Sequence, residues 1–129
     1  MNQISETVAQ ALQITFDNGR NAPSFTSTNL TELIGNLFIA GVLTALLEEV
    51  LYRGYMYGNL RAISNTVTAT IVTSLMFAVM HFDIAYIPFL IVFSSILCAL
   101  REKTGSIIPG VIVHALFNSL IITFTYAGS

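Results

Sequence analysis

Long apolar segments are the feature that most constrains the fold of this chain. Three of them contain no Asp, Glu, Lys or Arg: 66–82, 87–100 and 107–126. A fourth segment, 29–61, has no proline and could form one helix of about 30 residues that crosses a bilayer and projects from it. Backbone groups find no water inside a bilayer, so such segments are expected to be helical. The sequence therefore predicts an all-α, polytopic transmembrane helical bundle with about four membrane helices.

Composition supports this class of protein. Of the 129 residues, 54 % are hydrophobic and only 9 % are charged, whereas soluble domains carry about 25 % charged residues. The net charge is −2 with 5 Lys and Arg, so no basic surface for nucleic acid is expected. The single cysteine, Cys98, lies in an apolar run and is predicted to be a buried, inert thiol. The composition therefore predicts an integral, multi-pass protein whose partner is the lipid bilayer.

The N-terminal part, 1–29, differs from the rest and is expected to be a separate polar segment before the helical domain at 30–129. Apolar residues recur there at a spacing of four, which predicts a weak amphipathic helix: Ile4, Val8, Leu12 and Phe16. A linker rich in Asn, Gly, Pro and Ser follows it. The polar face lacks the Lys and Arg of a helix that binds anionic lipid, so packing on the main body or partial disorder is favoured.

The basic residues predict an orientation in the membrane. Arg61, Arg101 and Lys103 fall on one side if the four segments alternate, and an excess of Lys and Arg marks the cytoplasmic side. Asp83 and both termini would then lie on the other side.

Two local patterns concern helix ends and helix packing. Asn29 followed by Glu32 is a capping-box pattern for the start of the first long helix. Gly54 and Gly58 form a small-xxx-small pattern, which favours close packing of helices within the bundle.

The stretch "ALLEEVLYRG", 45–54, places Glu48, Glu49 and Arg53 inside an apolar segment. Each charge costs about 2.5–3.5 kcal/mol at a helix centre, so these groups should pair, face the bundle interior, or lie near the interface. Glu49 and Arg53 stand at i and i+4 in the favourable order for an ion pair. Glu48 points about 100° away and is left for another partner. The alternative is a charged cluster that merely extends toward the cytoplasmic interface.

Other polar residues lie inside the later segments, again at a spacing of four. Phe77 and His81 share a face of the second segment, and His114 and Asn118 share a face of the fourth. Taken singly, they suit an interfacial histidine and interhelical hydrogen bonds worth about 0.6 kcal/mol each. At 1.5 Å per residue, Glu48, His81, His114 and Asn118 lie roughly 10–22 Å from the cytoplasmic ends of their segments, so they could form one site.

Three spaced motifs thus occur in order on apolar segments: Glu48-Glu49-x-x-x-Arg53, Phe77-x-x-x-His81 and His114-x-x-x-Asn118. With the flanking "YRG" and "TGSIIPGVIVHALFN", this pattern over 40–122 resembles the CAAX prenyl protease and bacteriocin-processing family. These are intramembrane endopeptidases related to the type II CAAX prenyl endopeptidase. The resemblance implies the cell membrane of a prokaryote as the location of this chain.

The resemblance also implies hydrolysis of a peptide bond in a membrane-associated or lipidated peptide or protein, of the CAAX type or related to bacteriocins. It makes Glu48 the general base, with His81 helping to hold the water and with His114 and Asn118 lining the oxyanion site. The supporting residues would be Glu49, Arg53 and Phe77.

No cofactor is expected. The alternative is a catalytic zinc ion held by Glu48, His81 and His114, two histidines and a carboxylate with an open position. Zinc proteases usually carry both histidines as HExxH on one helix, whereas here they lie on separate segments, which favours glutamate catalysis without metal.

Two further functions remain open from the residues alone. The chain could be a non-enzymatic bacteriocin-immunity or scaffold membrane protein of the same fold. A proton-coupled transporter is less favoured, since the buried Glu and His residues suit one but broken helices and repeats are missing from the sequence pattern.

Overall fold

The structure is a computed structural model that describes residues 27–128; the amphipathic helix predicted near the N-terminus lies outside the described residues. One long helix, Leu30–Ile63, comes first. It consists of five consecutive segments: α2 (Leu30–Asn36), η1 (Leu37–Leu43), α3 (Thr44–Glu49), η2 (Val50–Met56) and α4 (Tyr57–Ile63). The later elements are α5 (Thr66–Val79), the short 3-10 helix η3 (Ile84–Tyr86), α6 (Ile87–Thr104) and α7 (Ile108–Ala127). The predicted all-α fold is confirmed.

Side-chain caps begin two of these helices. The side chain of Asn29 accepts a hydrogen bond from the backbone N–H of Glu32 at 2.9 Å, as the capping-box pattern predicts. The Glu32 carboxylate, however, accepts from the backbone N–H and the hydroxyl of Thr28, at 2.7 and 2.8 Å, and not from Asn29. Asn65 caps α5 in the same way by accepting from the N–H of Thr68 at 2.8 Å. These caps satisfy backbone donors that have no partner inside the helix.

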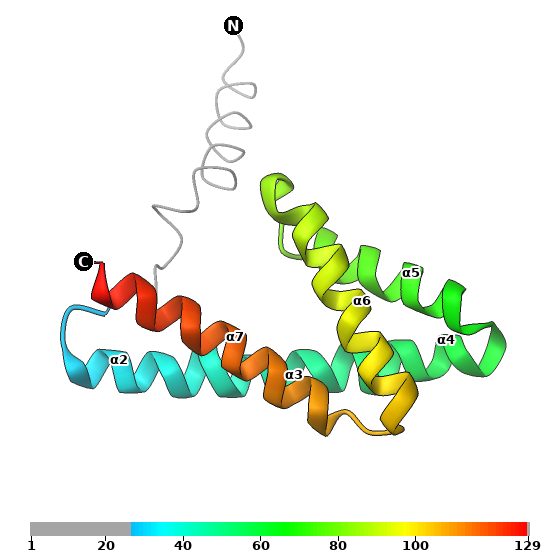
Figure 1. Ribbon diagram of the computed structural model, residues 1–129, viewed down its shortest axis with the longest axis horizontal. Helices are drawn as coiled ribbons and strands as arrows, with labels where there is room; N and C mark the ends of the chain where they lie inside the picture. Colours follow the sequence, from blue (N-terminus) through cyan, green and yellow to red (C-terminus); the bar gives the residue numbers. More distant parts are fainter. Residues whose placement is uncertain (1–26, 129) are drawn as a thin grey trace, which may run out of the picture.

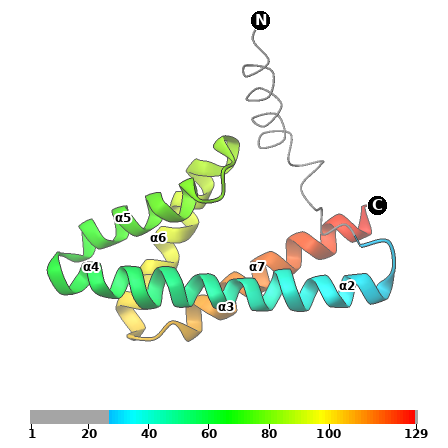
Figure 2. The same cartoon turned by 180° about the vertical axis from the view of Figure 1, so that it is seen from behind.

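The helices form a base and two arms (Figure 1). The long first helix is the base. The arm α7 packs along η1 and α3, and the hairpin of α5 and α6 packs against η2 and α4. Figure 2 shows from behind that α7 and the hairpin leave the base helix in different directions. The segment α3 packs against α7, and η2, which follows it, packs against the hairpin.

Within residues 27–128, three helices are long and apolar enough to cross a membrane: Leu30–Ile63, Ile84–Thr104 and Ile108–Ala127. The fourth predicted span is a shorter apolar helix, α5, of 14 residues. Many large hydrophobic side chains face outward from all of these helices, which suits lipid and not water. The chain thus has the apolar helices of a multi-pass integral membrane protein.

The second predicted segment, 66–82, is too long by three residues, because α5 ends at Val79. Met80 to Phe82 form a turn, and Phe82 has a φ of 53°, a left-handed conformation that an α-helix cannot contain. Asp83 then accepts a hydrogen bond from the N–H of Ala85 at 3.1 Å and starts the 3-10 helix. His81 therefore lies in the turn after α5 and not on the helix itself.

The close helix contacts involve other glycines than predicted. A side chain at Gly58 would meet nothing within 4 Å, and one at Gly54 would make only ordinary contacts at 3.8 and 3.9 Å. In contrast, a Cβ at Gly41 or at Gly110 would lie 2.8 Å from a side-chain oxygen across the contact between the base helix and α7. At Gly110 that oxygen is Oε2 of Glu49. The prediction that Gly54 and Gly58 allow close packing of helices was wrong.

The predicted burial of Cys98 is confirmed. Its side chain is fully buried and packs with Tyr57 and Ala69 in a small apolar cluster where α4, α5 and α6 meet.

Candidate active site

The two glutamates lie on a short α-helical segment between two π-helical segments. Glu48 and Glu49 end α3, with η1 before it and η2 after it. A carbonyl in each π segment accepts a hydrogen bond from the side chain of another helix. Ala40 in η1 accepts from Asn118 at 3.2 Å, and Arg53 in η2 accepts from Nε of Arg101 at 3.4 Å. π turns occur often at functional sites, and here they fix α3 relative to α6 and α7.

Glu49 and Arg53 form the predicted ion pair. Nη1 of Arg53 donates to Oε1 of Glu49 at 2.8 Å, and both side chains are fully buried. Nη2 of Arg53 donates to the hydroxyl and to the carbonyl of Ser94, at 2.6 and 3.2 Å. The guanidinium carbon lies 4.6 Å from the centroid of the Phe77 ring. The pair is therefore tied to α6 by Ser94 and covered by an aromatic ring from α5.

Ser94 is a residue of the site that the sequence analysis missed. A hydroxyl side chain in the middle of the apolar run 87–100 was the available signal, because a polar group at that position needs a partner.

His114 connects the two glutamates. It is only 3 % exposed, and its ring lies edge-on between Phe77 and Phe93, with centroid distances of 5.8 and 5.4 Å. Nδ1 lies 2.9 Å from Oε1 of Glu49, and Nε2 lies 3.4 Å from Oε2 of Glu48. With the Glu49 carboxylate as acceptor, Nδ1 carries the hydrogen, and Nε2 is directed at Glu48. Glu48, which the helical spacing left for another partner, thus lies beside His114.

The four residues predicted to be catalytic line one open cavity of about 300 Å³: Glu48, His81, His114 and Asn118. Glu48 is the more accessible glutamate, because its side chain is 26 % exposed whereas that of Glu49 is fully buried. The structure therefore brings the predicted set together, with Glu48 facing the cavity and Glu49 behind it.

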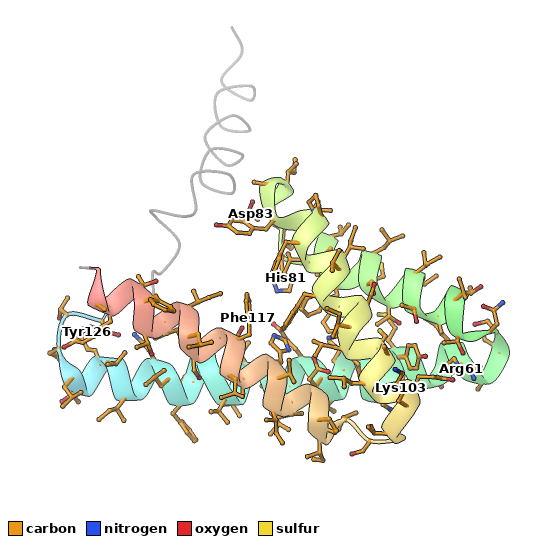
Figure 3. The ribbon with its side chains drawn as sticks, in the orientation of Figure 1. Arg61, His81, Asp83, Lys103, Phe117 and Tyr126 are labelled. Atoms are coloured by element: carbon orange, nitrogen blue, oxygen red, sulfur yellow. The ribbon has the colours of Figure 1, made fainter. Side chains whose placement is uncertain are left out.

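His81 reaches this cavity from the turn after α5. Nδ1 donates to the carbonyl of Phe77 at 2.7 Å, and the imidazole packs on the Phe77 ring at a centroid distance of 4.5 Å. A carbonyl can only accept, so Nδ1 carries the hydrogen and Nε2 of the neutral ring is left as an acceptor. In Figure 3, His81 lies on the side of the hairpin that faces Phe117 of α7.

Asn118 makes an interhelical hydrogen bond, the role expected of this amide taken singly. It lines the cavity with His114, but one amide hydrogen is bonded to the carbonyl of Ala40. Its second amide hydrogen remains for another acceptor, because the side-chain amide has two.

A second, mostly apolar cavity of about 280 Å³ continues from the first between α6 and α7. The two cavities share His81, His114, Asn118 and Ile121. Three aromatic rings dominate the new part and pack on one another with centroid distances of 4.8–5.9 Å: Phe89, Phe93 and Phe117. The polar cavity thus opens into an aromatic one.

The zinc alternative requires Glu48, His81 and His114 as one ligand set. Within residues 27–128 no three His, Cys, Asp or Glu side chains are grouped closely enough to hold a metal ion. The arrangement therefore does not assemble the donors that this alternative needs.

Comparison with known proteins places the chain in a family. Fold and site define a multi-pass membrane protein with a polar centre buried among its helices. Residues 30–120 match the family of the type II CAAX prenyl endopeptidase Rce1-like proteins, and the chain belongs to this family.

One curated relative is the UPF0177 protein YxdF of Lactococcus lactis subsp. lactis (strain IL1403). It is 30 % identical over 99 residues, which cover 70 % of this chain and 54 % of the relative. The chain thus spans about half the length of this relative. No solved structure matches the chain. Neither the family description nor the name of the relative mentions bacteriocin immunity, so that alternative gains no support.

Proposed function

We propose that this chain forms the catalytic part of an intramembrane endopeptidase that hydrolyses a peptide bond in a membrane-associated or lipidated substrate. The observation that carries the proposal is the position of Glu48. Its carboxylate faces a cavity that also presents two histidines and an amide, while a fully buried ion pair lies behind it. Membership in the CAAX endopeptidase family supports the same chemistry.

In the proposed reaction, Glu48 takes a proton from a water molecule while the water oxygen attacks the carbonyl carbon of the peptide bond. Nε2 of His81, left as an acceptor by the bond at Nδ1, orients this water. The second amide hydrogen of Asn118 and, when protonated, Nε2 of His114 stabilise the oxyanion. The proton on Glu48 then passes to the leaving amine as the C–N bond breaks. Nε2 of His114 lies 3.4 Å from Oε2 of Glu48, so a protonated His114 would also stabilise the Glu48 carboxylate.

Glu49 and Arg53 support this reaction without touching the substrate. Glu49 accepts from both Arg53 and His114, so its carboxylate fixes the ring orientation that directs Nε2 at Glu48. Phe77 covers Arg53 and packs on both imidazoles. The aromatic cavity beside the site would accept an apolar or lipid-modified residue next to the bond that is cleaved.

The test compares the wild type with Glu48→Gln on prenylated and unprenylated peptide libraries, with fragments identified by mass spectrometry. Loss of a general base typically lowers the rate by about 10²–10⁴, so Glu48→Gln should nearly abolish cleavage. Glu32→Gln is the matched control, because this exposed carboxylate caps the start of the same helix, far from the cavity, and should retain activity.

Equal fragment patterns from the wild type and Glu48→Gln would contradict the proposal. Peptide binding without cleavage by the wild type would favour the non-enzymatic alternative. A parallel incubation with a chelator tests the mechanism, since loss of activity there would overturn glutamate catalysis without metal.

A further inference from the structure

A third cavity, of about 280 Å³, lies at the other end of the hairpin and is separate from the candidate active site. Its walls come from α4 and from the end of α6, and they include both charged and glycine residues: Tyr57, Gly58, Arg61, Arg101, Glu102 and Gly105. None of these residues lines the two cavities of the candidate site. The third cavity therefore needs an explanation of its own.

One wall of this cavity is already neutralised. Arg61 holds the Glu102 carboxylate with Nη2 at 2.9 Å from Oε1 and Nε at 3.0 Å from Oε2. Tyr57 and Thr66 donate their hydroxyls to the same carboxylate, at 2.7 and 3.1 Å. The remaining guanidinium nitrogen of Arg61, Nη1, donates to the carbonyl of Ser64 at 3.1 Å. Arg61 and Glu102 thus satisfy each other and leave no net charge on this wall.

Arg101, which also lines the cavity, is not neutralised. Its Nε donates to the carbonyl of Arg53 at 3.4 Å, which fixes the plane of the guanidinium group. Within the described part of the chain, its two terminal nitrogens have no hydrogen-bond or ion-pair partner. Each of them carries two N–H donors. An oriented cationic fork with four unused donors therefore borders the cavity.

The cavity also has room for a bound group. A Cβ added at Gly58 would meet no atom outside its own helical turn within 4 Å, and one added at Gly105, which ends α6 with a φ of 69°, would likewise meet none beyond its chain neighbours. No side chain of the described residues therefore fills the space in front of these two glycines.

We propose that this cavity binds the phosphodiester head group of an anionic membrane phospholipid, with Arg101 as its principal donor. The guanidinium fork matches phosphate oxygens in a bidentate manner. Arg61 and Lys103 lie at the same end of the molecule as the cavity, as Figure 3 shows, and Asp83 lies far from them at the tip of the hairpin. The end of a membrane protein that is rich in Lys and Arg usually faces the cytoplasm. Anionic lipids are concentrated in the cytoplasmic leaflet, and basic pockets between membrane helices bind their head groups.

The first test measures lipid retention by native mass spectrometry after incubation of the purified protein with equal amounts of phosphatidylglycerol and phosphatidylcholine. The wild type should retain phosphatidylglycerol preferentially. Arg101→Gln should lower this retention about tenfold or more, because it removes charge-assisted bonds to the phosphate. The matched control is Lys103→Gln, which removes the same charge outside the cavity and should lower retention at most about fivefold. Arg101→Lys keeps the charge without the fork and should fall between the wild type and Arg101→Gln.

The second test fills the cavity without changing any charge. Gly58→Leu should lower phosphatidylglycerol retention, whereas Gly35→Leu, another helical glycine with nothing within 4 Å, should not. Equal losses for Arg101→Gln and Lys103→Gln, or unchanged retention in Gly58→Leu, would overturn the proposal. Displacement of the lipid by millimolar inorganic phosphate would assign the site to free phosphate and overturn the lipid assignment.

Discussion

At the scale of single residues, Arg53 is the group on which the buried polar contacts of the site converge. It joins Glu49 of its own helix to Ser94 of α6, and Phe77 covers its guanidinium group. A buried ion pair loses much hydration, so its net stabilisation is small, but removal of one partner leaves the other charged and buried. The contribution of Arg53 to stability is therefore best measured by substituting Arg53 alone.

Arg53→Met should lower the free energy of unfolding by about 3–5 kcal/mol, because Glu49 would remain buried without its cation. The measurement is denaturant titration of the detergent-solubilised protein, followed by helical circular dichroism. The control is Arg61→Met, whose ion pair with Glu102 is about one third exposed, so its loss should lower the free energy of unfolding much less. Equal and small losses for both variants would contradict a structural role for the buried pair.

The sequence predicted contacts within one helix better than contacts between helices. The Glu49–Arg53 pair follows from the spacing of four residues and is present. The contacts of Glu49 with His114 and of Arg53 with Ser94 cross between helices, so they depend on crossing angles and depths that spacing does not specify.

At the scale of elements, the continuity of the first helix was predicted from the sequence, but its internal π segments were not. Its apolar length predicted one continuous helix, and Leu30–Ile63 is continuous. Its π segments were not predicted, because no proline or other local signal marks them and their freed carbonyls are bonded by Asn118 and Arg101 from other helices. The early end of α5 was missed for a similar reason, since an apolar Phe82 in a left-handed conformation has no signature in hydrophobicity.

The crossing of α7 over α3 gives a prediction at this scale. A methyl group at Gly110 would lie 2.8 Å from Oε2 and 3.5 Å from Cδ of Glu49, a carboxylate that Arg53 and His114 hold in place. Gly110→Ala should therefore lower the free energy of unfolding by about 1–3 kcal/mol, as overpacking does in other cores. It should also reduce cleavage if the proposed peptidase activity is correct, because the His114 ring would lose its orientation.

Two glycines of the long first helix serve as controls in the same denaturant titration. Gly41→Ala meets the Ser119 hydroxyl at 2.8 Å, but rotation about χ1 can move that oxygen away, so a smaller loss is expected. Gly35→Ala meets nothing and should be neutral or stabilising by up to about 1 kcal/mol. If Gly110→Ala is as stable as Gly35→Ala, the carboxylate is not held as rigidly as its contacts indicate.

At the scale of the whole molecule, the basic residues gather at one end while apolar side chains face outward. Of the four Arg and Lys residues in 27–128, three lie at one end: Arg61 and Lys103 (Figure 3) and Arg101, which lines the same cavity as Arg61. The fourth, Arg53, is buried in the site. The position of these basic residues at one end could be predicted from the sequence, because it depends only on which loops carry the charges. The V-shaped divergence of α7 and the hairpin, which opens the cavity to Glu48, could not be predicted from the sequence.

The charge separation predicts that the end with Lys103 is cytoplasmic and that Asp83 lies on the opposite side. In intact bacterial cells expressing the protein, a membrane-impermeant maleimide should label Asp83→Cys, and it should label Lys103→Cys only after permeabilisation. The native Cys98 is an internal control, since its fully buried thiol should stay unlabelled until the protein is denatured. The opposite labelling pattern would reverse the orientation. It would also move the Arg101 cavity away from the anionic leaflet, so this experiment tests the membrane setting on which the lipid proposal depends.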